Sequence, residues 1–202
     1  MARVLIIIYI LAMLGVAVQL FLPSLRADQS HEYAEIKPVK VRIENFTLKT
    51  VMGDRTVSLK EFVKGHRLVL ISFMAPWCDN SIYDAPTINK LYEKYSDKGL
   101  EILTVSNYAP AEELMSFVEQ FNFVHTVVLD TRVKDENCRL NSRHYQFRKN
   151  LGDNRKWGTP LNVFVIDGQL DSPHVALGEL IEANAIAFIE SFLSRPSKAK
   201  RE

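Results

Sequence analysis

The chain has 202 residues, of which 47% are hydrophobic and 24% charged, and its formal net charge at pH 7 is +1. This length suits one domain with appendages, and the composition is that of a globular protein with a real core. The near-neutral balance argues against bulk nucleic-acid binding, which normally requires a strongly basic face. Two cysteines are too few for a disulfide framework or a zinc cage. The five histidines show no ligand spacing, so we expect no metal, and we expect no other cofactor.

The N-terminal residues predict a membrane segment. After Arg3, residues 4–22 form a nearly uninterrupted apolar run. Its length is close to the ~20 residues that cross a bilayer and exceeds the ~7–15 of a signal-peptide core. We therefore favour a transmembrane anchor over residues 1–22, with the N-terminus in the cytoplasm. The alternative is a signal segment that is cleaved to give a secreted protein. In both cases the main domain lies on the extracytoplasmic (periplasmic) side, where disulfide chemistry is permitted.

The rest of the chain divides by composition. Residues 23–38 are polar or turn-forming and predict a linker, and the basic tail at 195–202 is predicted to be disordered. The domain between them, residues 39–194, opens with a strand-like pattern that ends at Leu48. The apolar run at 68–73 does not alternate, which is typical of a central strand covered on both faces.

Strands and helices then alternate. We expect helices at residues 79–96 (with Pro86 inside), 110–121 and 179–193. We expect further strands at residues 100–105, 125–129, 161–166 and near 175. The charged segment 131–156 is predicted to be partly helical. This alternation indicates an α/β protein, a three-layer α/β/α sandwich around a mixed, largely parallel central sheet.

One short stretch carries the chemistry. The run at 68–73 leads through Ala75-Pro76-Trp77 to Cys78, at the predicted start of a helix. The first turn of a helix has unpaired N–H groups and partial positive charge, which favour a thiolate over a thiol. A dithiol motif would place a second cysteine three residues later, but Ser81 stands there, so the motif is CxxS. Cys78 is the candidate nucleophile; the alternative is a buried, inert cysteine.

Several motifs follow one another in an order known from one family. They are Asn45-Phe46-Thr47-Leu48, Gly53, Leu59, Ala75-Pro76-Trp77-Cys78, Pro86 and Thr159-Pro160. From about residue 41 to 192 the chain resembles the membrane-anchored thioredoxin-like proteins of the TlpA/ResA type, within the redoxin (AhpC-TSA) group. The resemblance implies a thioredoxin-like fold, thiol-disulfide exchange, and a cis-proline at Pro160 that faces Cys78. The chain departs from the family at Ser81, where the second cysteine normally stands.

The other candidate site residues flank Cys78. Trp77 supplies an apolar wall beside the sulfur and, with Thr159 and Pro160, a surface for substrate. Ser81 can hydrogen-bond a thiolate but cannot expel a bound partner as a disulfide. Asp84 lies three residues later on the same helix face. The resemblance implies that Asp84 is a buried acid that handles protons, and the alternative is an exposed carboxylate that favours the helix dipole.

Cys138 lies in the charged segment 131–156. If this segment folds over Cys78, Cys138 is a candidate resolving thiol in place of Ser81, which requires the two Cα atoms to lie within about 7 Å. Otherwise it is an unpaired surface or semi-buried cysteine. The same segment is rich in Lys and Arg, which predicts either a basic lid or partner surface, or one solvated helix face.

Three functions fit these patterns. The first is an exported thiol-disulfide oxidoreductase that acts through Cys78 and forms mixed disulfides with protein or small-molecule thiols and disulfides. The second, favoured by Ser81, is a non-catalytic module that binds partners in a groove around Trp77 and Pro160. The third is a peroxiredoxin-like peroxidase in which peroxide oxidises Cys78 and Cys138 resolves it.

Overall fold

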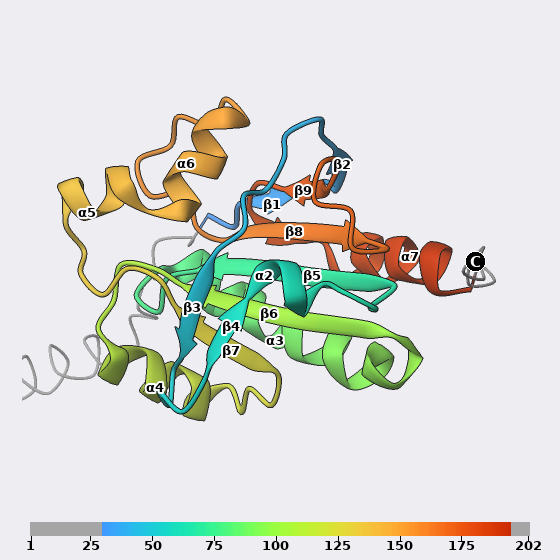
Figure 1. Ribbon diagram of the computed structural model, residues 1–202, viewed down its shortest axis with the longest axis horizontal. Coiled ribbons are helices and arrows are strands. Elements are labelled where there is room, and N and C mark those ends of the chain that lie inside the picture. The colour runs from blue at the N-terminus through green and yellow to red at the C-terminus, as the bar shows by residue number, and fades with distance from the viewer. Residues whose placement is uncertain (1–29, 195–202) are drawn as a thin grey trace, which may run out of the picture. The chain divides into compact units, whose positions relative to one another are not determined.

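The computed structural model describes residues 30–194 (Figure 1). The predicted membrane segment at 1–22, the first part of the predicted linker and the tail at 195–202 lie outside the described residues. Within residues 30–194, no helix combines the length and the apolar character that crossing a bilayer requires.

Eight strands form a mixed sheet in the order β2-β9-β8-β5-β6-β7-β3-β4. Their bounds are β2 Lys37–Pro38, β3 Thr47–Thr50, β4 Thr56–Ser58, β5 Leu68–Met74, β6 Leu100–Ser106, β7 Thr126–Leu129, β8 Leu161–Ile166 and β9 His174–Ala176. The mixed sheet is confirmed, but parallel pairing is confined to β5, β6 and β7. The remaining pairs are antiparallel, so the sheet is not largely parallel. Parallel neighbours need crossover helices, which here follow β5 and β6.

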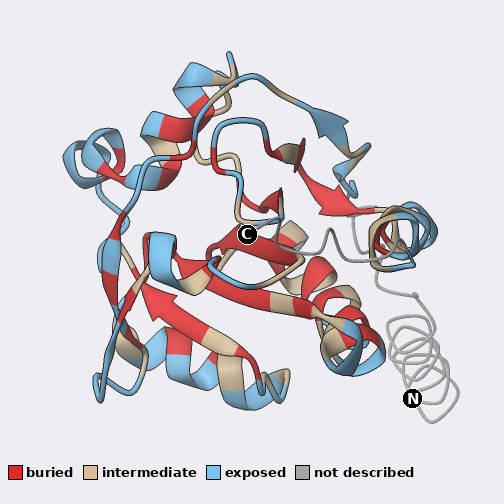
Figure 2. Ribbon diagram, turned by 45° about the vertical axis from the view of Figure 1, so that its right-hand side comes forward, coloured by how far each residue is buried: buried red, intermediate tan, exposed pale blue. Residues whose placement is uncertain are grey.

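Helices cover both faces of this sheet, which confirms the α/β architecture. Their bounds are α2 Leu59–Phe62, α3 Asp79–Tyr95, α4 Ala111–Gln120, α5 Glu136–Asn141, α6 Arg143–Asn150 and α7 Glu182–Leu193, with a short 3₁₀ turn, η1, at Ser96–Lys98. Successive β5 residues face opposite layers: Leu70 belongs to the core cluster that contains Leu91 of α3 and Ile189 of α7, whereas Ile71 belongs to the cluster that contains Phe147 of α6. Figure 2 shows the buried strands between helices that are exposed on their outer sides.

The elements around the cysteine agree closely with the predictions. All seven residues of β5 are buried, as expected of a strand covered on both faces. The helix that begins after Cys78 runs through Pro86 to Tyr95, and β8 has the predicted bounds, Leu161–Ile166.

The two ends of the domain differ from the predictions. Residues 39–46 form no strand, although Ile43 and Phe46 are buried in the core. The last helix begins at Glu182, because Glu179–Leu180 form β10 and pair in parallel with β1, Tyr33–Ala34. Strands β1 and β2 thus lie within residues 23–38, for which the sequence predicts a linker. A two-residue strand is too short to show apolar periodicity, so these strands cannot be recognised from the sequence.

Candidate thiol site

Cys78 lies where the central strand β5 gives way to α3. Its backbone is extended (φ −89°, ψ 119°), and it is the N-cap residue of α3. The turn between them is closed by a hydrogen bond from Cys78 N to Ala75 O (3.0 Å). The residue is half-buried, so the sulfur is neither sealed in the core nor fully in solvent.

The segment before β8 meets the sulfur. The Thr159–Pro160 peptide bond is cis, as the family resemblance implies. The thiol of Cys78 donates a hydrogen bond to Thr159 O over 3.2 Å. Thr159 and Pro160 are both buried. The structure therefore brings together the candidate nucleophile and the cis-proline, which lie far apart in the sequence.

Trp77 forms one wall beside the cysteine. Its indole N–H donates to Tyr108 O (2.9 Å), and its ring meets Trp157 edge-on with centroids 5.6 Å apart. Lys134 places its ammonium 3.4 Å from the centroid of the Trp77 ring, a cation–π arrangement. Trp157 and Lys134 were not among the residues predicted for the site.

Ser81 is buried and supports the turn. Its hydroxyl accepts a hydrogen bond from Ala75 N (3.3 Å), so its oxygen is tied to the backbone just before the Pro76–Cys78 turn. A cysteine at this position would lie one helical turn after Cys78, whereas the serine present can only make polar contacts there.

Asp84 is a buried acid and not an exposed first-turn carboxylate. Only 3% of the residue is exposed. Its carboxylate accepts hydrogen bonds from Leu180 N (2.9 Å) and from the side-chain amide of Asn162 (2.7 Å). Burial raises the pKa of Asp84 to about 7, although these two hydrogen bonds oppose the shift and the charge of Glu179 adds to it. The site therefore contains an acid that can exchange a proton near neutral pH.

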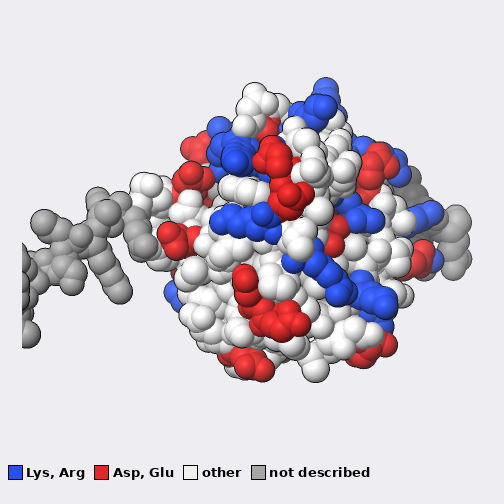
Figure 3. Space-filling model, turned by 90° about the vertical axis from the view of Figure 1, so that its left-hand side faces the viewer, with Lys and Arg blue, Asp and Glu red and all other residues white. Residues whose placement is uncertain are grey.

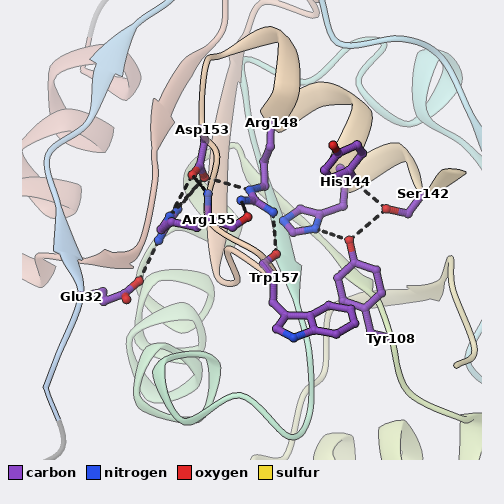
Figure 4. A network of polar contacts seen from close by, with 9 residues as sticks. Glu32, Tyr108, Ser142, His144, Arg148, Asp153, Arg155 and Trp157 are labelled. Atoms are coloured by element: carbon purple, nitrogen blue, oxygen red, sulfur yellow. Dashed lines mark hydrogen bonds and ion pairs between the residues drawn. The ribbon is translucent and has the colours of Figure 1, made fainter. Parts of the chain in front are cut away.

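A buried arginine holds the segment that leads to the cis-proline (Figure 4). The Arg148 guanidinium, from α6, donates to Asp153 (2.8 Å), to Trp157 O (2.7 Å) and to Arg155 O. It has no exposed surface, and a Cβ on Gly158 would overlap it. The backbone of residues 155–158 is therefore fastened directly to α6.

Asp153 neutralises the arginine. Burial raises the pKa of the Asp153 carboxyl, but hydrogen bonds from Arg155 and Arg148 outweigh this, so the pKa lies well below its ordinary range. Arg155 binds Asp153 (2.8 Å) and also Glu32 (2.7 Å). The buried charge is thus paired and hydrogen-bonded, as a buried ion pair requires.

Tyr108 connects helix α6, which carries Arg148, to Trp77, whose indole N–H donates to Tyr108 O. Its hydroxyl lies 2.9 Å from both Ser142 Oγ and His144 Nδ1, and its φ is +62°, which is uncommon for a residue with a side chain. Burial, followed by the charge of Arg148, lowers the pKa of His144 to about 3, so its imidazole is neutral. Burial raises the pKa of Tyr108 to about 12. This cluster supports the site without ionising near pH 7.

Cys138 lies on α5 and is exposed, and both cysteines are free thiols. Its backbone N–H donates to Asp135 (3.1 Å). The Cys78 thiol donates to Thr159 O, and a role for Cys138 as resolving thiol stays a prediction.

The basic segment 131–156 is largely paired with acids. Its ion pairs are Arg139 and Lys156 with Glu136, Arg143 with Asp130, Arg148 and Arg155 with Asp153, and Arg155 with Glu32. Figure 3, which views the side on which α5 lies, shows basic and acidic side chains interleaved. Across residues 30–194, no group of three or more His, Cys, Asp or Glu side chains is arranged to hold a metal ion.

A cis-proline beside the first residue of a helix, on a mixed sheet covered on both faces, defines the thioredoxin-like class. Solved structures agree on this fold. A putative thiol:disulfide interchange protein DsbE from Chlorobium tepidum is 20% identical, with a TM-score of 0.57 over 81% of this chain and 99% of that chain. A secreted disulfide oxidoreductase of Mycobacterium tuberculosis is 19% identical, with a TM-score of 0.53 over 72% and 95%.

A model of the AhpC/TSA family matches residues 39–169, and the chain belongs to this family. The thiol-disulfide oxidoreductase ResA of Bacillus thuringiensis is 31% identical over 86 residues, which is 43% of this chain and 48% of ResA. ResA of Halalkalibacterium halodurans is 29% identical over 123 residues, or 60% and 65%. The chain thus spans about half the length of the first of these relatives. The resemblance to the TlpA/ResA type is confirmed.

Replacing Arg148 with methionine should loosen the segment before the cis-proline. The variant removes the donor to two backbone carbonyls and leaves Asp153 with Arg155 as its remaining partner, and losing one partner of a buried ion pair costs about 3–5 kcal/mol. We expect denaturant unfolding to show a loss of this size. Lys149→Met, at the next and exposed position, should stay within about 0.5 kcal/mol of wild type. Equal stabilities for the two variants would contradict this role for Arg148.

The raised pKa of Asp84 should appear in the stability of the protein. The folded-state pKa of about 7 exceeds the ordinary value of 3.8. The contribution of the protonated Asp84 carboxyl to the free energy of unfolding is therefore complete below about pH 4 and is lost as the pH rises through about 7. Relative to Asp84→Asn, the wild type should lose about 4 kcal/mol of unfolding free energy across that window. The measurement is urea unfolding at a series of pH values, with Asp79→Asn, exposed in the same helix, as control. A difference that does not change with pH would refute the shift.

Proposed function

We propose that the protein is a thiol-disulfide oxidoreductase that acts through the single motif cysteine Cys78 by way of mixed disulfides. The observation that carries the proposal is the 3.2 Å hydrogen bond between the Cys78 thiol and Thr159 O, at a half-buried helix N-terminus beside a cis-proline. Attack on a disulfide requires a thiolate and access to its sulfur. The exposure of Cys78 and its place at the start of α3 support both requirements.

The chemistry is an exchange between sulfur atoms. The Cys78 thiolate attacks one sulfur of a partner disulfide, so that a Cys78–partner disulfide forms and the other partner sulfur leaves as a thiolate. A second thiolate, from the partner or from another molecule, then attacks the mixed disulfide and releases Cys78. Because Ser81 has no sulfur, residue 81 cannot carry out this second step. The protein returns to its starting state and the electrons pass between its partners.

Asp84 is the proton donor and acceptor for this exchange. Its pKa of about 7 lets it hold a proton or release one at neutral pH, which is the range in which a thiol must ionise and a leaving thiolate must be protonated. Asn162 connects it to the cis-proline strand, because Asn162 lies two residues after Pro160 and donates to the Asp84 carboxylate (2.7 Å).

The partners are protein or small-molecule thiols and disulfides. A partner would lie against the half-buried ring of Trp77 and the segment at Thr159–Pro160. The apolar residues 1–22 support an exported protein anchored in the membrane, with secretion after cleavage as the alternative. Relatives and neighbours with thiol-disulfide oxidoreductase or interchange names support the activity.

The reactivity of Cys78 is the primary test. Reduced protein is mixed with an aromatic disulfide that releases a coloured thiol, and the rate is followed at neutral pH. We expect a fast phase that exceeds the rate of a free-thiol peptide, that disappears in Cys78→Ser and that persists in Cys138→Ser. A cysteine no faster than the peptide, together with full biological activity of Cys78→Ser, would favour a non-catalytic binding module instead.

Ser81→Cys should convert the site into a dithiol. The new thiol lies one turn from Cys78 and can attack a mixed disulfide there. We expect the adduct with a disulfide peptide, which is long-lived in the wild type, to decay rapidly in the variant and to leave an internal disulfide, as gels and mass spectrometry would show. The control is Asn80→Cys, because residue 80 lies on a different helix face. An unchanged adduct lifetime in Ser81→Cys would show that residue 81 does not limit release.

A further inference from the structure

Residues 31–34 form a strap that is built into the domain and that no site prediction included. Its end is β1, which pairs in parallel with the two-residue strand β10. Glu179 N donates to Glu32 O over 2.8 Å. A Cβ on Gly178 would overlap Glu32 O, so the glycine allows the strap to approach this closely.

The other edge of β10 holds the buried acid of the thiol site. Backbone N–H groups alternate in direction along a strand. Glu179 N therefore points to the strap, while Leu180 N donates to Asp84 (2.9 Å). The Asn162 amide, which donates to Asp84, also donates to Gly178 O (3.1 Å). A single strand thus separates the strap from Asp84.

The Glu179 side chain belongs to the strap as well. The residue is 1% exposed. Its carboxylate accepts a hydrogen bond from Glu32 N (2.9 Å) and lies 2.8 Å from His31 Nδ1. The His31 ring packs on Tyr33 and on Tyr83 of α3, with centroids 5.1 Å and 4.5 Å apart. His31 therefore joins the strap to α3, the helix that begins after Cys78 and carries Asp84.

A second contact runs from the strap to the cis-proline side. The Glu32 carboxylate binds Arg155 (2.7 Å), and Arg155 binds Asp153, the partner of Arg148. Figure 4 shows Glu32 at the outer end of this chain of contacts, which leads to the backbone at Trp157. Both segments that flank the cysteine are thus connected to the same four residues.

We propose that the strap His31–Ala34 is a positioning element of the thiol site, in which Glu179 sets the charge environment of Asp84 and Glu32 steadies the segment before the cis-proline. Glu179 is the charged group that acts on Asp84, while Asn162 of β8 and the backbone of β10 supply neutral donors. Around Glu179 lie His31 and the backbone of Glu32. A neighbouring carboxylate disfavours ionisation of Asp84, so with Glu179 present Asp84 stays protonated to a higher pH than it would without that charge.

This inference rests on the thiol site of the proposed function, but its test measures the titration midpoint of Asp84 and not the rate of thiol exchange. The full chain is labelled with carbon-13 at aspartate carboxyls, and the Asp84 signal, assigned with Asp84→Asn, is titrated by NMR. Glu179→Gln should lower the Asp84 midpoint by about 0.5 pH unit. Glu182→Gln, three residues later and paired with the exposed Lys90, should leave it unchanged. The titration is repeated in a Cys78→Ser background, so a failed redox test and a failed strap test are separate results.

The second connection is tested separately. Glu32→Gln keeps the backbone donor to Glu179 but loses the ion pair with Arg155. Amide hydrogen exchange at residues 155–159 should then be up to about fivefold faster, with the Asp84 midpoint unchanged. Should Glu179→Gln fail to fold, His31→Phe removes the contact at Glu179 while keeping the ring contacts, and the Asp84 midpoint should again move. An unmoved midpoint in the folded variants, with unchanged exchange in Glu32→Gln, would overturn the proposal.

Discussion

The hydrogen bond from the Cys78 thiol to the Thr159 carbonyl is the contact on which the site depends. It joins the start of α3 to the segment before β8, and each side is held by its own scaffold. On one side, β5 is buried on both faces and Ser81 ties the turn to Ala75 N. On the other side, Arg148 fastens the backbone up to Trp157. Because both sides are held in this way, the thiol is kept in a fixed orientation to the segment before the cis-proline, and such positioning favours reaction.

The same region contains an acid whose ionisation is unfavourable. Asp84 receives two hydrogen bonds, which normally lower a carboxyl pKa, and yet burial outweighs them and the pKa rises to about 7. A well-packed apolar residue at this position would avoid the cost of burying a charge. Here the fold instead surrounds a titratable group with fixed donors, on the helix that begins at a candidate nucleophile, and such an arrangement is typical of a functional site.

The fold was largely predictable because its signals are local. The unbroken apolar runs of β5 and β8 and the helical spacing of α3 come from neighbouring residues, and Cys78 lies where two such patterns meet. Thr159-Pro160 was found only because its order along the chain matches a family. The burial of Asp84 was not decidable, because it depends on Asn162 and Leu180, which are 78 and 96 residues away in the sequence.

Polar residues that act over long distances were missed for the same reason. Arg148 looked like one more cation in a charged segment, but it is fully buried, because Asp153 and the backbone at Trp157 satisfy its donors. The helical pattern predicts a helix that begins at Glu179, whereas Glu179 lies in the two-residue strand β10, whose partner β1 falls within the predicted linker. Such residues become visible only when the topology brings distant segments together.

The serine at position 81 separates two properties that a dithiol motif combines. In a dithiol site the second cysteine both supports the turn and resolves the adduct. Here Ser81 keeps the polar contact to Ala75 N, so the turn that positions Cys78 is retained. Because serine has no sulfur, residue 81 cannot attack a mixed disulfide and release the partner. Under the proposed function, the lifetime of an adduct is then governed by how a second thiol reaches the half-buried sulfur past Trp77 and Trp157. Such a protein would then discriminate between thiols by their access to the Cys78 sulfur, and not by the reactivity of a second cysteine in its own motif.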